Sequence, residues 1–202
     1  NGKSVPPTPS VANPQPIKPI KNFMSNVARG QTTEVHAHGE ITVAKASDSP
    51  SGNIVPGNDV TLAKWNLQAS YEETEVRGFC FTIINAPNQT VAGPAGNGSL
   101  NGTVQFVRST GQVVYSMVAA NLQWETCVDL SQYFAVPQNA TETLSVKANI
   151  SQAARGSLRA RLSKVKGMGH NSAFLFESRG DVYGNTLTLP QQVPLPPPEL
   201  AV

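Results

Sequence analysis

The sequence predicts an all-β fold, a single two-sheet sandwich with Greek-key connections, and three observations support this. Charged residues make up only 14% of the 202 residues, and the abundant Asn, Gln, Ser, Thr and Gly suit short strands and polar turns better than charged helices. Apolar residues recur at every second position in several short segments. Turn-forming residues separate these segments, and roughly eight or nine strands at this spacing are typical of a sandwich.

The first two predicted strands lie at 34–43 and 60–69. Residues 34–43 alternate apolar and polar side chains, so this strand has one buried and one exposed face. Residues 60–69 change phase after Leu62, which indicates a bulge, and Trp65 is a core candidate. A turn region rich in Ser, Pro, Gly and Asn joins the two strands over 48–58.

The middle of the chain predicts a central strand and a hairpin. Residues 76–84 are apolar on both faces, as in a strand with neighbours on both sides. The acidic residues just before it, Glu72, Glu73 and Glu75, are expected to form a solvated hairpin edge. Segments 104–107 and 113–118 flank a four-residue connection at 109–112, which is the spacing of a hairpin.

Further alternating strands are predicted at 122–130, 144–150 and 158–162, and a short last strand at 186–189. One segment differs, because Ile20, Phe23, Met24 and Val27 follow the i, i+3, i+4, i+7 spacing of a helix. Residues 20–28 are therefore either a short helix or an extended segment whose apolar side chains enter another subunit.

Proline marks the two ends of the chain and predicts three segments. Six of the sixteen prolines lie in residues 1–20 and five in 190–202. We expect an extended N-terminal arm at 1–30, the sandwich at 31–189 and a Pro-rich C-terminal arm at 190–202. Such arms have little to bury by themselves, so they need a surface to lie on, and a neighbouring copy of the chain can supply it.

The two cysteines, Cys80 and Cys127, are predicted to form a disulfide, with two buried thiols as the alternative. Disulfides persist in oxidising compartments, and the composition is typical of secreted proteins, so we expect an extracellular or cell-surface location. No apolar run approaches the roughly 18 residues of a membrane span. Because the chain opens with Asn1, we expect a leader peptide to have been removed. Five Asn-x-Ser/Thr sequons are candidate glycosylation sites: Asn88, Asn97, Asn101, Asn139 and Asn149.

Several classes of function find no support in the sequence. The net charge of +2 is too small to indicate a nucleic-acid partner. Neither a Gly-x-Ser-x-Gly motif nor a phosphate-binding loop with its Lys is present. Glu34, His36 and His38 would share one face of a strand and could ligate a metal, but nothing in the sequence supplies a second shell. We therefore expect no catalytic residue, cofactor or metal, and no enzymatic activity.

Four segments carry a resemblance to a known group of domains: 39–45 (GEITVAK), 49–53 (SPSGN), 60–65 (VTLAKW) and 143–150 (TLSVKANI). Together they resemble the immunoglobulin-like β-sandwich modules of bacterial cell-surface and S-layer-like proteins, over about residues 39–189. The resemblance implies an immunoglobulin-like fold and a surface location, and it brings no catalytic residues with it. The Pro-rich arms depart from these modules.

These observations favour a structural subunit of an extracellular homopolymer, such as a surface filament or pilus-like fibre. One arm would add as a strand to the next copy, as in donor-strand complementation, or pack in its groove. The expected apolar anchors of that arm are Ile17, Ile20, Phe23, Met24 and Val27. The alternatives are a surface adhesin or carbohydrate-binding module that uses exposed, coplanar Trp124 and Tyr133, with glycans as partners, and an S-layer, virion capsid or decoration protein.

Overall fold

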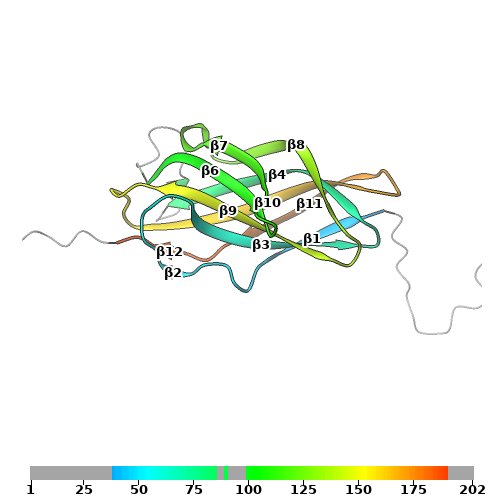
Figure 1. The fold of residues 1–202 in the computed structure, drawn as a ribbon, viewed down its shortest axis with the longest axis horizontal. Helices are drawn as coiled ribbons and strands as arrows, with labels where there is room; N and C mark the ends of the chain where they lie inside the picture. The colour runs from blue at the N-terminus through cyan, green and yellow to red at the C-terminus, as the bar shows by residue number, and fades with distance from the viewer. Residues whose placement is uncertain (1–37, 86–88, 91–98, 191–202) are drawn as a thin grey trace, which may run out of the picture. The chain divides into compact units, whose positions relative to one another are not determined.

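The computed structural model describes residues 38–85, 89–90 and 99–190, and their strands form two β-sheets (Figure 1). The five-stranded sheet has the order β1 (Glu40–Lys45), β3 (Val60–Ser70), β9 (Thr141–Ile150), β6 (Leu100–Arg108), β7 (Val113–Val118). The seven-stranded sheet has the order β2 (Gly52–Asn53), β12 (Leu187–Thr188), β10 (Ser157–Gly169), β4 (Thr74–Asn85), β5 (Gln89–Thr90). In addition, β8 (Thr126–Val136) pairs with β4, and β11 (Leu175–Tyr183) pairs with β10. The prediction of an all-β, two-sheet fold is confirmed.

Aromatic side chains from both sheets meet within the largely aliphatic core between them. The ring of Phe106 on β6 lies with its centroid 4.4 Å from that of Phe79 and 4.6 Å from that of Phe81, both on β4. Trp65 on β3 is fully buried, as predicted, and its indole Nε1–H donates to the carbonyl oxygen of Val182 on β11 at 2.9 Å. Burial of the indole therefore leaves no polar group without a partner.

The strand predictions with the strongest patterns are confirmed. The phase change in 60–69 is a bulge in β3, where the register against β9 shifts between Thr61 and Ala63, and Leu62 and Ala63 are both buried. The strand predicted to be central, β4, pairs with β10 on one side and with β8 and β5 on the other. The hairpin of β6 and β7 is present.

The structure differs from the strand predictions in three places, of which the simplest is that β10 runs to Gly169 and not only over 158–162. The strand expected at 122–130 begins only at Thr126, after the 3-10 turn η1 (Ala119–Asn121). Leu122 N–H donates to the Ala119 carbonyl at 3.1 Å, and Gln123 N–H donates to the Thr126 hydroxyl at 3.0 Å. These bonds stabilise a turn, so residues 122–125 do not pair with a neighbouring strand. Trp124 lies in this turn with 70% of its surface exposed. In addition, β11 was not predicted, because most of its residues are exposed and its alternation is weak.

The described chain begins and ends at opposite ends of the sandwich (Figure 1). His38 packs its ring on Phe174, in the turn between β10 and β11, with the ring centroids 4.2 Å apart. At the other end, Leu189 N–H donates to the Gly156 carbonyl at 2.8 Å. The predicted N-terminal arm, its five apolar anchors, and residues 191–202 of the C-terminal arm lie outside the described residues, so they stay predictions.

Candidate binding face on the seven-stranded sheet

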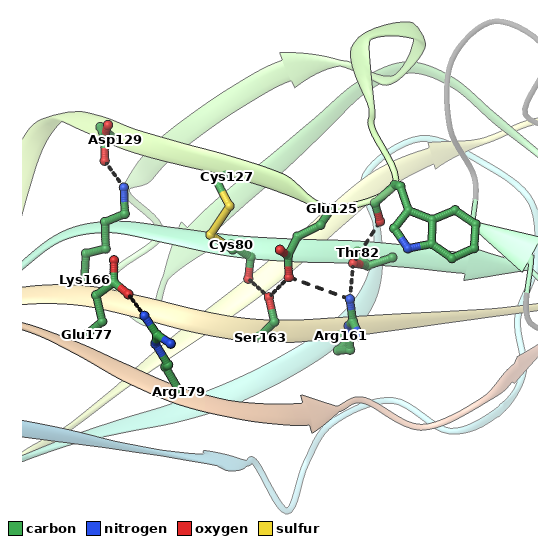
Figure 2. Close-up of a disulfide and its surroundings, with 11 residues drawn as sticks. Cys80, Thr82, Glu125, Cys127, Asp129, Arg161, Ser163, Lys166, Glu177 and Arg179 are labelled. Carbon is green, nitrogen blue, oxygen red and sulfur yellow. Dashed lines mark hydrogen bonds and ion pairs between the residues drawn. A yellow bond between two sulfur atoms is a disulfide. The ribbon is translucent and has the colours of Figure 1, made fainter.

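The outer face of the seven-stranded sheet, which points away from the core, carries an ordered row of charged side chains. The strand register places Glu177 on β11 beside Lys166 on β10, Lys166 beside Gly78 on β4, and Gly78 beside Asp129 on β8. Because Gly78 has no side chain, Lys166 extends over β4, and its Nζ reaches Asp129 Oδ1 at 2.8 Å (Figure 2). The row therefore crosses four strands and ends in an ion pair.

The next row of the same face contains the disulfide. Cys80 on β4 lies directly opposite Cys127 on β8, and the two form the predicted cross-strand bond (Figure 2). The same register continues through Lys164 on β10 to Arg179 on β11, whose guanidinium bonds Glu177 at 3.1 Å. The disulfide thus joins β4 to β8, the strand that carries Asp129 of the ion pair.

A second polar cluster surrounds Arg161 on β10. Its guanidinium donates to the Thr82 hydroxyl at 2.9 Å and lies 3.7 Å from a carboxylate oxygen of Glu125 and 3.6 Å from one of Asp181. A register shift in β10 occurs at Ser163, and the Ser163 hydroxyl lies 2.5 Å from Glu125 Oε1 and 3.2 Å from the Cys80 carbonyl (Figure 2).

A hollow of about 390 Å³ opens beside the Lys166–Asp129 pair. Eight residues line it: Arg77, Asp129, Tyr133, Lys166, Gly167, Leu175, Phe176 and Glu177. They come from four neighbouring strands, β4, β8, β10 and β11. The hollow therefore belongs to the rigid sheet and not to a loop.

The shape of the hollow follows from a bulge and a glycine. Between Gly78 and Val76 the register of β8 advances from Asp129 to Phe134, so several β8 residues stand opposite Arg77 alone. Tyr133 lies in this bulge and is half exposed. The Arg77 guanidinium covers its ring, 4.8 Å from the centroid, and is fixed by two hydrogen bonds to Glu75 Oε2 at 2.9 and 2.8 Å. On the other side, Phe176 lies over Gly167, where a Cβ would come within 2.5 Å of the ring.

Glu72 corrects the expectation of a solvated acidic edge. Its carboxylate is buried and accepts hydrogen bonds from the backbone N–H groups of Gly39 (2.6 Å), Asn171 (2.7 Å) and Ser172 (3.0 Å), and from the Ser172 hydroxyl (2.5 Å). Sequence reasoning missed this role because the bonds come from residues 33 and about 100 positions away. The carboxylate fastens the start of β1 to the turn between β10 and β11.

The other sites that the sequence singled out are dispersed. Asn101 is exposed on β6 and faces Asn149 on β9, whose side-chain oxygen accepts a hydrogen bond from Asp59 N–H at 3.0 Å. Asn139 is exposed at φ 59° in the turn before β9, and Asn88 and Asn97 lie outside the described residues. So do Glu34 and His36, and no group of three metal-ligating side chains occurs among residues whose positions are described. Trp124 and Tyr133 are both exposed, but Trp124 precedes β8 and Tyr133 lies towards its far end.

Comparison with known proteins gives no family. No family model matches the chain, and no curated protein matches it. Among solved structures, one that is similar comes from a study titled "The details of glycolipid glycan hydrolysis by the structural analysis of a family 123 glycoside hydrolase from Clostridium perfringens". The identity is 7%, the TM-score is 0.39, and the match covers 76% of this chain and 28% of the other. This chain thus spans about a quarter of that one, and the likeness carries no argument about function. No described helix is long and apolar enough to cross a membrane.

Proposed function

We propose that this chain is an extracellular structural subunit without enzymatic activity, built on an immunoglobulin-like Greek-key sandwich. Copies of it polymerise into a filament when the N-terminal arm of one copy adds as a strand to the β7 edge of the next. The observation that carries the proposal is the composition of β7. The disulfide supports the extracellular location, because such bonds persist in oxidising compartments.

Among the described residues, nothing gives the β7 edge the usual protection against pairing with another chain. Within the described part of the chain, β7 pairs with β6 alone. Its six residues, VVYSMV, include no charged residue and no proline, and Val113 and Val118 are about half exposed. Natural sheets normally protect an edge of this kind with charges, prolines or a covering segment, because unpaired N–H and C=O groups attract another strand. An edge that is left open is suited to strand addition.

The other edges of the two sheets suit strand addition less well. Cα atoms of β1 and β11 approach one another within 8 Å, whereas a strand inserted between two others needs them roughly 9.6 Å apart. The groove of about 230 Å³ between these strands is correspondingly narrow. The β8 edge is bulged and carries Asp129, and the edge strands β2 and β5 are each only two residues long. By elimination, β7 is the acceptor.

The N-terminal arm supplies a donor of suitable composition and reach. Residues 17–27 carry the five apolar anchors Ile17, Ile20, Phe23, Met24 and Val27. This segment is longer than β7, which has 6 residues. The ten residues 28–37 between this segment and the described sandwich span at most about 35 Å when extended. The segment can therefore extend away from its own sandwich towards another copy. A heterologous contact of this type propagates into an open filament instead of closing.

The test uses two variants that each lack one half of the contact. Deletion of residues 1–28 removes the donor, and the double substitution Val113→Lys/Val118→Lys places charges on the acceptor edge. We expect filaments from the unmodified chain by electron microscopy and monomers from each variant alone by light scattering. When the two variants are mixed, the intact arm of one should pair with the intact edge of the other and give dimers that grow no further.

A matched control is Val55→Lys, because Val55 is the most exposed large apolar residue among those described and lies away from β7. This variant should assemble like the unmodified chain. Filaments from the chain that lacks residues 1–28, or from Val113→Lys/Val118→Lys, would contradict the proposal. Electron microscopy of native material also distinguishes a filament from an S-layer or a virion shell.

A further inference from the structure

The geometry of the hollow on the seven-stranded sheet points to a second function, and we propose that it binds a neutral carbohydrate. The proposal does not rest on the assembly described above. The hollow lies on the outer face of the seven-stranded sheet, whereas β7 is an edge of the five-stranded sheet. A polymer built through β7 would therefore carry one such site on every subunit.

The apolar part of the hollow suits the C–H face of a sugar ring. Tyr133 on β8 is half exposed, Leu175 on β11 is 63% exposed, and Phe176 on β11 is partly buried over Gly167. Three large apolar side chains thus line the hollow, two of them exposed, among lining residues that are mostly charged. Small-ligand sites typically combine such an apolar lining with a few fixed polar groups.

The polar part of the hollow consists of charges that are already paired. Lys166 is bonded to Asp129 at 2.8 Å, Arg77 to Glu75 at 2.8 Å, and Glu177 to Arg179 at 3.1 Å. Each cation thus has a carboxylate partner, and the charges of the three pairs cancel. The lining therefore carries no excess charge of either sign that would attract a charged ligand.

A polyhydroxylated neutral ligand needs no such excess charge. The ammonium group of Lys166 has three N–H donors and uses one of them on Asp129. The side chain of Asp129 is 80% exposed, so it can also accept hydrogen bonds from a ligand. Sugar hydroxyls both donate and accept, and they can therefore bond to both members of one pair without separating them.

The site is preorganised, which favours binding of a flexible ligand. All eight lining residues lie on strands, Gly78 leaves room for the Lys166–Asp129 pair, and Glu75 holds Arg77 against Tyr133. Fixed side chains lose little conformational freedom on binding. The volume of about 390 Å³ falls at the lower end of the range for small-ligand sites, which suits a short segment of an oligosaccharide.

The experiment is a glycan array that contains neutral and acidic oligosaccharides, followed by calorimetric titration with the neutral oligosaccharide that gives the strongest signal. The protein is the full chain with Val113→Lys/Val118→Lys, so that assembly does not add avidity. We expect saturable binding, reduced about tenfold or more by Tyr133→Ala and by Asp129→Asn. Trp124→Ala is the matched control, because Trp124 is the more exposed aromatic and lies outside the hollow.

Circular dichroism and thermal unfolding of each variant show whether the fold is retained. If Tyr133→Ala does not fold, Leu175→Ser tests the same lining with an exposed residue and should also weaken binding. Absence of binding to every neutral oligosaccharide would overturn the proposal. Binding confined to acidic glycans would do so as well, and so would an affinity that Trp124→Ala lowers but Tyr133→Ala and Asp129→Asn leave unchanged.

Discussion

Lys166 and Asp129 form an ion pair although a whole strand separates them. Lys166 lies on β10 and Asp129 on β8, and β4 runs between these strands. Their side chains meet at 2.8 Å because the residue between them is Gly78. The carbonyl oxygen of Val128 and the carboxylate of Asp129 occupy the space that a Cβ at this position would need. The glycine therefore fixes both the approach of β8 to β4 and the charged row of the outer face.

Substitution of Gly78 by Ala should consequently destabilise the sandwich. A Cβ at position 78 would overlap a backbone oxygen, which cannot move without shifting β8. We expect a loss of about 1–3 kcal/mol in the free energy of unfolding, measured by urea denaturation. Gly180→Ala on β11 is the matched control, because nothing lies within 4 Å of its added Cβ. Equal denaturation midpoints for the two variants would contradict this account.

The disulfide should contribute a larger share of stability. It closes a loop with a sequence separation of 47 residues, which corresponds to about 4 kcal/mol when loop-closure entropy alone is counted. We expect Cys80→Ala/Cys127→Ala to lower the free energy of unfolding by about 2–4 kcal/mol. Addition of a reducing agent should lower the stability of the unmodified chain to a similar level and leave the double variant unchanged. If the reducing agent also lowered the stability of the double variant, loss of the disulfide would not explain its effect on the unmodified chain.

Substitution of the two tryptophans should have very different effects on stability. Trp65 is fully buried and bonded to Val182, whereas Trp124 is 70% exposed. Trp65→Ala should therefore cost about 3–5 kcal/mol of stability, and Trp124→Ala should stay within about 0.5 kcal/mol of the unmodified chain. Fluorescence gives a second measurement: Trp124→Phe should leave a blue-shifted emission that acrylamide quenches poorly. Strong quenching in that variant would place Trp65 at the surface and refute the described core.

The parts of this fold that the sequence predicts are those with a strong local pattern. The bulge after Leu62, the burial of Trp65 and the central position of β4 each follow from alternation or from a run of apolar residues. The pairing of Cys80 with Cys127 follows because the chain has no other cysteine. For the strand features the information lies in neighbouring residues, and for the disulfide it lies in the number of cysteines.

The candidate binding face depends on the register between strands, which local patterns do not contain. Nothing near Gly78 in the sequence indicates that Lys166 and Asp129 will meet above it. β11 has weak alternation, because its core-facing side includes Ser178 and Gly180 and its charged side begins with Leu175. Leu175 and Phe176 could therefore not be assigned to a strand. The role of Glu72 was missed for the same reason, because the N–H groups that donate to its carboxylate belong to residues far away in the sequence.

The environment of Glu72 gives the fold a specific dependence on pH. The hydroxyl of Ser172 is the largest influence and lowers the pKa of the Glu72 carboxyl, burial acts in the opposite direction, and the N–H groups of Ser172, Asn171 and Gly39 lower it further. The resulting pKa is about 2, against an ordinary value of 4.5. A carboxyl with a depressed pKa in the folded state stabilises the fold above its unfolded pKa and loses that contribution as the pH falls towards the folded pKa.

We therefore expect the stability contributed by Glu72 to be complete above about pH 5 and to decline between about pH 4.5 and pH 2. Glu72→Gln cannot ionise, so this variant should be less stable than the unmodified chain at pH 6, and the difference should narrow as the pH falls through that interval. Urea denaturation at a series of pH values measures it. Glu73→Gln, an exposed neighbour at 3.7 Å from His170, is the control and should follow the unmodified chain. A stability difference for Glu72→Gln that stays constant from pH 6 to pH 2 would contradict the depressed pKa.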